Sequence, residues 1–103
     1  MIWWITGESG SGKTTLAKKL KTTNSIFLDA DTMRPAICED LGFSEADRRA
    51  NNLRVARLAK VLDDQEYDVI VSTICPYEDL KQQVYWICKC RFIKVEGQHK
   101  CVK

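Results

Sequence analysis

The residues most clearly suited to chemistry form a glycine-rich segment near the N-terminus. Residues 7–14 match the pattern G-x-x-x-x-G-K-[ST] in full, between an apolar run and a helical pattern. Glycines let successive backbone N–H groups converge on phosphate oxygens, and the start of the following helix favours the same anion. Lys13 would neutralise the β- and γ-phosphates, and Thr14 would bind Mg²⁺ through its hydroxyl. The pattern predicts a nucleoside triphosphate site made of Gly7, Glu8, Ser9, Gly10, Ser11, Gly12, Lys13, Thr14 and Thr15.

A pair of carboxylates follows the second apolar run. Asp29 and Asp31 come directly after residues 26–28, and in a parallel sheet the ends of the strands form the edge where ligands bind. Such a pair can hold Mg²⁺ through water and accept the proton of an attacking hydroxyl. The alternative is that one of them, for example Asp31, only caps the segment that follows. We favour the catalytic interpretation, because the pair ends an apolar strand beside a triphosphate site.

Apolar patterning along the chain predicts an α/β fold. Four short apolar runs are typical of buried strands, and three stretches have helical periodicity. The strands are expected at 2–6, 26–28, 68–72 and 92–95, and the helices at 13–21, 48–62 and 79–86. Ser44 with Asp47 fits a capping box loosely. The alternation predicts a parallel sheet of about four strands with helices on both faces.

Length and composition place these elements in one small domain. The 103 residues suit a single domain over 1–103, since domains most often hold about 100–150 residues. No apolar run approaches the ~18 residues that a membrane span needs, and no basic segment precedes the first apolar run. We therefore expect a cytoplasmic protein without a membrane partner.

Charge is distributed unevenly along the chain. Residues 1–80 carry a net charge of −3, and residues 81–103 carry +5. A basic tail can bind nucleic acid. We interpret it instead as a solvated surface around the last strand, so we do not expect a nucleic-acid partner. The five cysteines, an odd number, favour reduced thiols over a disulfide framework.

Three blocks beyond the glycine-rich loop carry more specific sequences. They span residues 28–34, 40–48 and a later run that starts at 51–56 and ends in 71–77, and with the loop they resemble the adenylylsulfate kinase family over residues 2–95. The Leu-Gly-Phe-Ser…Asp-Arg block and the Ile-x-Pro-Tyr block discriminate far better than the loop does. The resemblance implies a P-loop NTPase fold of the nucleotide-kinase type, here truncated, with ATP and Mg²⁺ as cofactors. It also implies transfer of the γ-phosphate of ATP to the 3′-hydroxyl of adenosine 5′-phosphosulfate.

The resemblance also implies roles for individual residues. Lys13, Asp29 and Asp31 would act on the reacting groups, and Asp29 would hold Mg²⁺ through water. The site for the nucleotide acceptor would be formed by Asp31, Arg34, Arg48, Asn51, Ile74 and Lys81.

Arg48 and Asn51 are three residues apart, so on a helix they share one face and can converge on one anion. Arginine suits that task because its planar fork binds two oxygens together. The alternative for Arg48 is a surface ion pair with Glu45 or Asp47.

The chain departs from the family's pattern at three places. Cys75 replaces the usual serine, and we interpret it as a small buried residue after the third strand. Leu53 and Arg54 stand where the family has two arginines, which removes one charge from the acceptor side. Lys81 replaces an arginine and keeps the charge without the planar fork.

Nothing after Val95 resembles the basic lid and the aromatic clamp of the family. Without a lid, water enters the site and hydrolysis of ATP competes with transfer. Three alternatives follow: a second copy of the chain or a partner subunit closes the site, a bulky acceptor covers it, or activity is weak.

Two other functions stay open. One is a P-loop kinase for another hydroxyl, such as that of a nucleoside or a nucleic-acid end. The other is an ATP-binding regulatory module.

Cysteine and histidine residues near the C-terminus form a second candidate site. Cys88, Cys90, His99 and Cys101 offer a Cys₃His set for zinc, since residues i and i+2 of a strand point the same way. The single-residue gaps do not match a recognised zinc finger. We therefore favour the interpretation that they are unpaired cysteines and a lone histidine.

Overall fold

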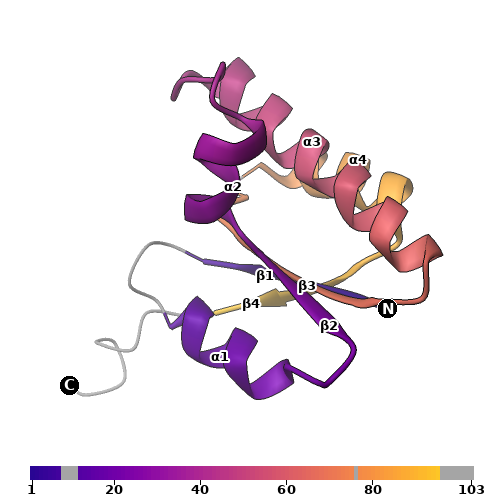
Figure 1. The fold of residues 1–103 in the computed structure, drawn as a ribbon. Helices are drawn as coiled ribbons and strands as arrows, with labels where there is room; N and C mark the ends of the chain where they lie inside the picture. The colour runs from indigo at the N-terminus through magenta and orange to yellow at the C-terminus, as the bar shows by residue number, and fades with distance from the viewer. Residues whose placement is uncertain (8–11, 76, 96–103) are drawn as a thin grey trace.

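A four-stranded parallel sheet with helices on both faces organises the chain (Figure 1). This computed structural model describes residues 1–7, 12–75 and 77–95. The strands are β1 (Ile2–Thr6), β2 (Ser25–Asp29), β3 (Asp68–Thr73) and β4 (Arg91–Lys94). The helices are α1 (Lys13–Leu20), α2 (Ala30–Ile37), α3 (Glu45–Asp64) and α4 (Glu78–Cys88). The predicted fold class is confirmed.

The strand order brings the candidate residues to one edge of the sheet. The order is β2-β3-β1-β4, and every neighbouring pair is parallel. In this register Ser72 of β3 stands between Ile5 of β1 and Asp29 of β2. Because all the strands run in the same direction, the glycine-rich loop, Asp29 and the segment after β3 all leave from the same side, which we call the carboxyl edge.

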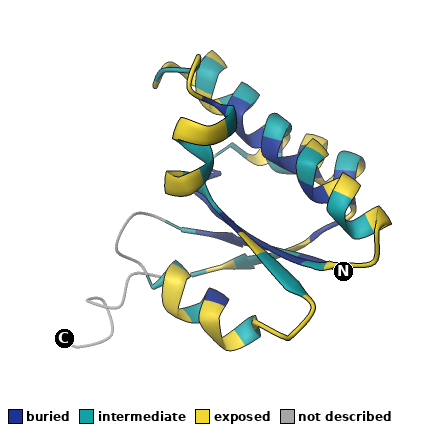
Figure 2. Ribbon diagram, in the orientation of Figure 1, coloured by how far each residue is buried: buried dark blue, intermediate teal, exposed yellow. Residues whose placement is uncertain are grey.

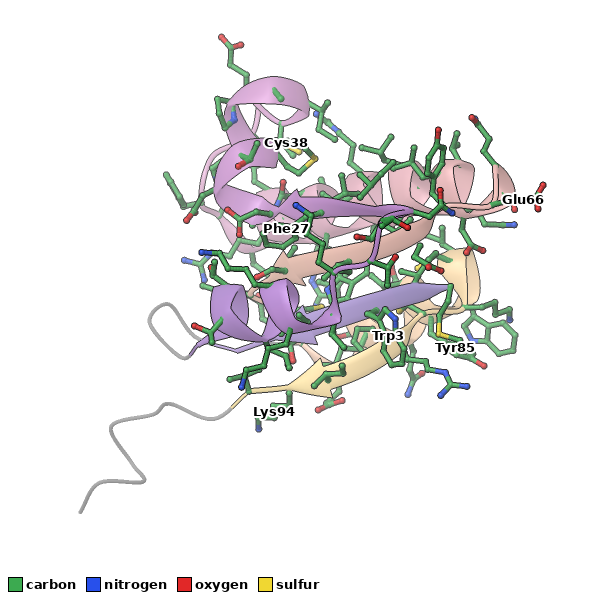
Figure 3. The ribbon with its side chains drawn as sticks, turned by 60° about the horizontal axis from the view of Figure 1, so that its bottom comes forward. Trp3, Phe27, Cys38, Glu66, Tyr85 and Lys94 are labelled. Atoms are coloured by element: carbon green, nitrogen blue, oxygen red, sulfur yellow. The ribbon has the colours of Figure 1, made fainter. Side chains whose placement is uncertain are left out.

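The two faces of the sheet are covered unequally (Figure 2). Helices α3 and α4 pack on one face and bury the larger core around Trp4. Helix α1 lies on the other face, whose small buried cluster consists of Ile5, Ala17 and Ile70. Figure 3 shows this face with Phe27 on it, and Phe27 remains 38% exposed. The α1 face therefore holds a smaller buried cluster than the α3 face.

A buried hydrogen-bond chain joins β1, β3 and α3. Trp4 Nε1 donates to Thr73 Oγ1 at 2.8 Å, and Thr73 Oγ1 donates to Asn52 Oδ1 at 2.8 Å. The Nδ2 group of Asn52 donates to the carbonyls of Arg48 at 3.0 Å and Ile74 at 3.3 Å. The side chains of Trp4, Thr73 and Asn52 are at most 1% exposed. Their polar groups therefore form hydrogen bonds with one another in place of hydrogen bonds to water.

The helices differ from the expected ones in their bounds and in one additional helix: α1 ends at Leu20, α3 spans Glu45–Asp64, α4 spans Glu78–Cys88, and α2 is new. Helix α3 begins at Glu45 rather than Arg48, and the Ser44 hydroxyl caps it by accepting a hydrogen bond from the Asp47 N–H at 3.1 Å. Helix α2 was not predicted, because it buries no residue and contains Pro35. Proline usually ends a helical pattern, and a buried apolar face is the main signal for a helix.

In the part of the chain that the structure describes, no helix is both long enough and apolar enough to cross a membrane.

Replacement of Thr73 by valine tests the buried hydrogen-bond chain. Valine keeps the shape of the side chain but leaves Trp4 Nε1 and Asn52 Oδ1 without partners, at about 1–3 kcal/mol for each group. We expect Thr73→Val to lower the free energy of unfolding in urea by at least about 2 kcal/mol. Thr23→Val, in an exposed loop, is the matched control and should change it by less than about 0.5 kcal/mol. Similar effects of the two substitutions would contradict the assignment.

Candidate functional site

The glycine-rich loop leaves β1 and leads directly into α1. Gly12 is the N-cap residue of α1 and has a φ of 97°, in the left-handed region where a side chain would be strained. The Lys13 ammonium donates a hydrogen bond to the carbonyl of Gly7 at 2.8 Å, across the loop. Positions 8–11, which include Glu8 and Ser9, lie outside the described residues. The two described ends of the loop have the strand-to-helix arrangement that phosphate binding requires.

The first turn of α1 is open to an anion. Thr14 and Thr15 are exposed, the first turn holds no acidic residue, and no side chain caps the helix. Backbone N–H groups at the start of a helix have no partner within the helix, and they form the positive end of its dipole. This turn can therefore receive a phosphate, with the Thr14 hydroxyl accessible to a metal ion.

Asp29 and Asp31 lie at the carboxyl edge, where β2 passes into α2. Asp29 is the N-cap residue of α2, yet its carboxylate makes no capping hydrogen bond. Asp31 lies in the first turn and is exposed. Burial lowers the pKa of the Lys13 ammonium, and the charges of Asp29 and Asp31 raise it. Both carboxylates therefore lie within electrostatic reach of Lys13. Asp29 does not cap α2 with its carboxylate, and the capping alternative for Asp31 stays a prediction.

Arg34 holds the loop between α2 and α3. Its Nη1 donates to the carbonyl of Gly42 at 3.0 Å, and its guanidinium lies 4.3 Å from the centre of the Phe43 ring. The N–H of Gly42 donates to Asp47 Oδ2 at 2.8 Å, and a Cβ at Gly42 would stand only 3.2 Å from that oxygen. The loop is thus tied to both helices, and it lines a hollow of about 320 Å³ together with Asp31.

Arg48 and Asn51 lie in the N-terminal part of α3. Arg48 is exposed and forms no ion pair within the described residues, so the alternative pairing with Glu45 or Asp47 is wrong. Arg49 takes that place, with Nε 3.0 Å from Glu45 Oε2. Asn51 is 5% exposed, and its Oδ1 has no hydrogen-bond partner. A buried amide oxygen without a partner is costly, so it fits a donor group of a ligand.

Arg49 and Arg54 hold the helices around the site in place. Arg49 of α3 makes two hydrogen bonds to Asp79 of α4, at 2.7 and 3.2 Å, and its guanidinium lies over the ring of Tyr77. These contacts join α3 to α4. Arg54 donates to the last carbonyl of α2 at 2.6 Å and pairs with Asp40 at 2.7 Å. Neither role was predicted, because contacts between distant segments leave no local pattern in the sequence.

The segment after β3 contains Ile74 and Cys75, and Lys81 follows on α4. Ile74 is half-exposed, while Cys75 is buried as expected. Burial raises the pKa of the Cys75 thiol to about 11, although the nearby charge of Lys81 lowers it. The ammonium of Lys81 lies 3.6 Å from the carboxylate of Glu78. At neutral pH the Cys75 side chain is therefore an uncharged thiol. The nearby Lys81 is itself beside the carboxylate of Glu78.

Cys88 and Cys90 do not have the geometry that the zinc interpretation assumed. Cys88 is the last residue of α4, and Lys89 follows in a left-handed conformation with a φ of 51°, so the two cysteines are not neighbours on one strand face. Both thiols are buried. The hydrogen bond to Cys88, together with burial, raises the pKa of Cys90. His99 and Cys101 lie outside the described residues, within which no group of three potential metal ligands occurs.

Two buried polar residues near the site, Ser72 and Asn52, were not predicted. Ser72 is 1% exposed, and its hydroxyl has no hydrogen-bond partner in the described part of the chain. A polar residue directly after the apolar run 69–71, at the carboxyl edge, is the signal that marks Ser72. Asn52 leaves no such signal, because its partners outside α3, Thr73 and Ile74, lie more than twenty residues further along the chain.

Comparison with known proteins identifies one family. The sequence profile described as Adenylylsulphate kinase matches residues 1–100. The adenylyl-sulfate kinase of Burkholderia ambifaria is 42% identical over 88 residues, which cover 80% of this chain and 49% of that protein. The adenylyl-sulfate kinase of Yersinia pestis is 40% identical over 90 residues, which cover 82% of this chain and 42% of that protein. The chain spans about half the length, or less, of these curated relatives.

Solved structures of the same family superpose well on this fold. The Mycobacterium tuberculosis APS kinase in complex with AMPPNP and APS has a TM-score of 0.74 at 35% identity, covering 90% of this chain and 59% of that one. A hexameric APS kinase from Thiobacillus denitrificans has a TM-score of 0.76 at 27% identity, and the match covers 90% of this chain and 21% of that one. A Janibacter sugar kinase, 19% identical with a TM-score of 0.76 and covering 97% and 62%, shares the fold alone. With the match over residues 1–100, these similarities show that the chain belongs to the adenylylsulphate kinase family.

Proposed function

We propose that this chain binds ATP and transfers its γ-phosphate to the 3′-hydroxyl of adenosine 5′-phosphosulfate. The observation that carries the proposal is the group of charges at the carboxyl edge. There the Lys13 ammonium lies within electrostatic reach of the carboxylates of Asp29 and Asp31. One cation beside two carboxylates suits a reaction that must neutralise phosphate charge and also remove a proton.

The nucleotide half of the proposed site is formed by the loop and the first turn of α1. Phosphate oxygens would accept hydrogen bonds from the uncapped backbone N–H groups, and Lys13 would neutralise charge on the β- and γ-phosphates. The exposed Thr14 hydroxyl and the Asp29 carboxylate are oxygen donors of the kind that Mg²⁺ prefers, so they fit the ion. Bound Mg²⁺ would neutralise further phosphate charge.

The acceptor half of the proposed site is formed by α3. The exposed guanidinium of Arg48 has its donors available for two oxygens of the phosphosulfate group. One turn along the same face, Asn51 Oδ1 would accept a hydrogen bond from an N–H or O–H group of the acceptor nucleotide. Binding would thereby satisfy an amide oxygen that the fold alone leaves without a partner.

In the proposed reaction, the 3′-oxygen of the acceptor attacks the γ-phosphorus as the bond from that phosphorus to the bridging oxygen of ADP breaks. Asp31, which is exposed at the edge, accepts the proton of the hydroxyl. Lys13 stabilises the charge that develops on the transferred group and on the leaving oxygen. The chain thus contributes positioning and charge stabilisation, which dominate phosphoryl transfer.

Transfer from γ-labelled ATP tests the proposed function directly. The protein would be incubated with labelled ATP, Mg²⁺ and either adenosine 5′-phosphosulfate, adenosine or an oligonucleotide with a free 5′-hydroxyl. We expect label on the phosphosulfate alone, and a decrease of roughly 100-fold or more in Lys13→Ala, because a charge aimed at the transition state is lost. Lys18→Ala, on an exposed part of the same helix, is the control and should retain activity. Release of inorganic phosphate without any labelled acceptor would contradict the proposal.

Replacement of Arg48 separates binding of the acceptor from binding of ATP. Hydrogen bonds to charged groups contribute about 1.5–3 kcal/mol, so Arg48→Ala should raise KM for adenosine 5′-phosphosulfate about 10- to 100-fold. ATP affinity, measured by thermal stabilisation, should stay within about twofold. Arg57→Ala is the matched control, since Arg57 is also exposed on α3. An equal loss of ATP affinity in Arg48→Ala would remove Arg48 from the acceptor site.

A further inference from the structure

Ser72 is buried in a way that the fold does not explain. The residue is 1% exposed, and its Oγ has no hydrogen-bond partner within residues 1–7, 12–75 and 77–95. A buried hydroxyl without a partner destabilises a protein, so such groups are rare and often have a functional reason. Asn51 Oδ1 is the other buried side-chain atom of this kind in the described residues, and the proposed acceptor site already uses it.

The position of Ser72 shows which ligand its hydroxyl can reach. Side chains of a strand alternate between the two faces of a sheet, and Ile70 of β3 belongs to the cluster under α1. Ser72, two residues further on, faces the same side, whereas Thr73 faces the α3 side and bonds to Asn52. The hydroxyl therefore lies on the α1 face at the carboxyl edge, on the side of the sheet that the loop and α1 occupy.

The neighbours of Ser72 in the sheet are the two strands that carry the nucleotide site. Its register partners are Ile5, next to the end of β1, and Asp29, at the end of β2. Neighbouring strands lie about 4.8 Å apart, so Asp29 is separated from β1 by about 10 Å, with Ser72 between them. The Asp29 carboxylate makes no capping hydrogen bond and is free to accept one.

A hydroxyl at this place suits the water shell of Mg²⁺. P-loop NTPases hold the ion with a loop hydroxyl and an acidic residue from another strand. In this chain β3 pairs with β1 but ends in Ser72 and Thr73, without an acidic residue. The strand-end carboxylate nearest to the loop is therefore Asp29, on β2, which is the next strand beyond β3. Mg²⁺ keeps several of its waters, and those waters need acceptors. A serine hydroxyl can accept from such a water and donate to a carboxylate at the same time.

We propose that Ser72 is a positioning residue of the metal–nucleotide site, whose hydroxyl accepts a hydrogen bond from a Mg²⁺-bound water and donates one to Asp29. The inference rests on the proposed function, because it requires ATP and Mg²⁺ to bind at the loop. Ser72 on β3 would thus add a third oxygen to the site, placed between the oxygens of Thr14 on α1 and Asp29 on β2. Among the residues that the structure describes, the Ser72 hydroxyl has no hydrogen-bond partner, so both of these hydrogen bonds would form only when metal and nucleotide are bound.

Thermal melting in ATP with increasing Mg²⁺ tests the role of Ser72. Without ligands, Ser72→Ala should melt at the same temperature as the unchanged protein or higher, because the substitution removes a buried unpartnered hydroxyl. At a fixed ATP concentration, the Mg²⁺ concentration that gives half of the stabilisation should rise about tenfold, as for other residues that orient metal ligands. ATP in the presence of EDTA should stabilise both proteins equally.

Two further variants and the unchanged protein separate the possible outcomes. Ser72→Cys keeps the size of the side chain but accepts hydrogen bonds weakly, so it should raise the Mg²⁺ midpoint as well. Ser25→Ala, at the opposite end of β2, should leave it unchanged. An unchanged midpoint in Ser72→Ala or in Ser72→Cys would overturn the assignment of Ser72 alone. If ATP and Mg²⁺ failed to stabilise the unchanged protein, the proposed function would fail and the assignment with it.

Discussion

The buried hydrogen bonds that link Trp4, Thr73 and Asn52 are the interaction on which the candidate site depends. They join the strand that leads into the glycine-rich loop to the helix that carries Arg48 and Asn51. No water can substitute for a lost partner, because the three linked side chains are at most 1% exposed. The chain of bonds therefore fixes α3 relative to β1, and with it the two halves of the proposed site.

Within the residues that the structure describes, buried side-chain atoms without hydrogen-bond partners lie near the carboxyl edge. Both buried unpartnered side-chain atoms in the described residues, on Asn51 and Ser72, belong to segments that the sheet brings to this edge. The core under α3 and α4 satisfies its polar groups through Thr73 and Asn52. Local rules of polar satisfaction are most often broken at functional sites, so the contrast between core and edge supports placing the proposed reaction at the edge.

Much of the fold was predictable because its signals are local. The continuous apolar runs gave the four strands, and the Ser44 cap was visible in the sequence. Helix α2 was missed, since Pro35 and the absence of any buried residue remove both usual signals. The geometry assumed for Cys88 was wrong, because α4 extends to that residue and the spacing of two cysteines says nothing about where a helix ends. The loop and the carboxylate pair were singled out from their residue types. The sequence marks Ser72 only as a polar residue after an apolar run, and its place between Ile5 and Asp29 required the register of the strands.

Arg34 and Arg48 were both assigned to the proposed acceptor site, but their surroundings in the structure differ. Arg48 has no ion pair in the described part of the chain, so its whole guanidinium is available to an acceptor. Arg34 donates from Nη1 to the Gly42 carbonyl and lies over Phe43. A guanidinium carries five N–H donors, so Nε and Nη2 of Arg34 remain for a ligand while Nη1 holds the loop. In the proposed acceptor site, Arg34 would therefore couple the position of the Gly42–Phe43 loop to the acceptor, which a lysine with its single ammonium would do less well.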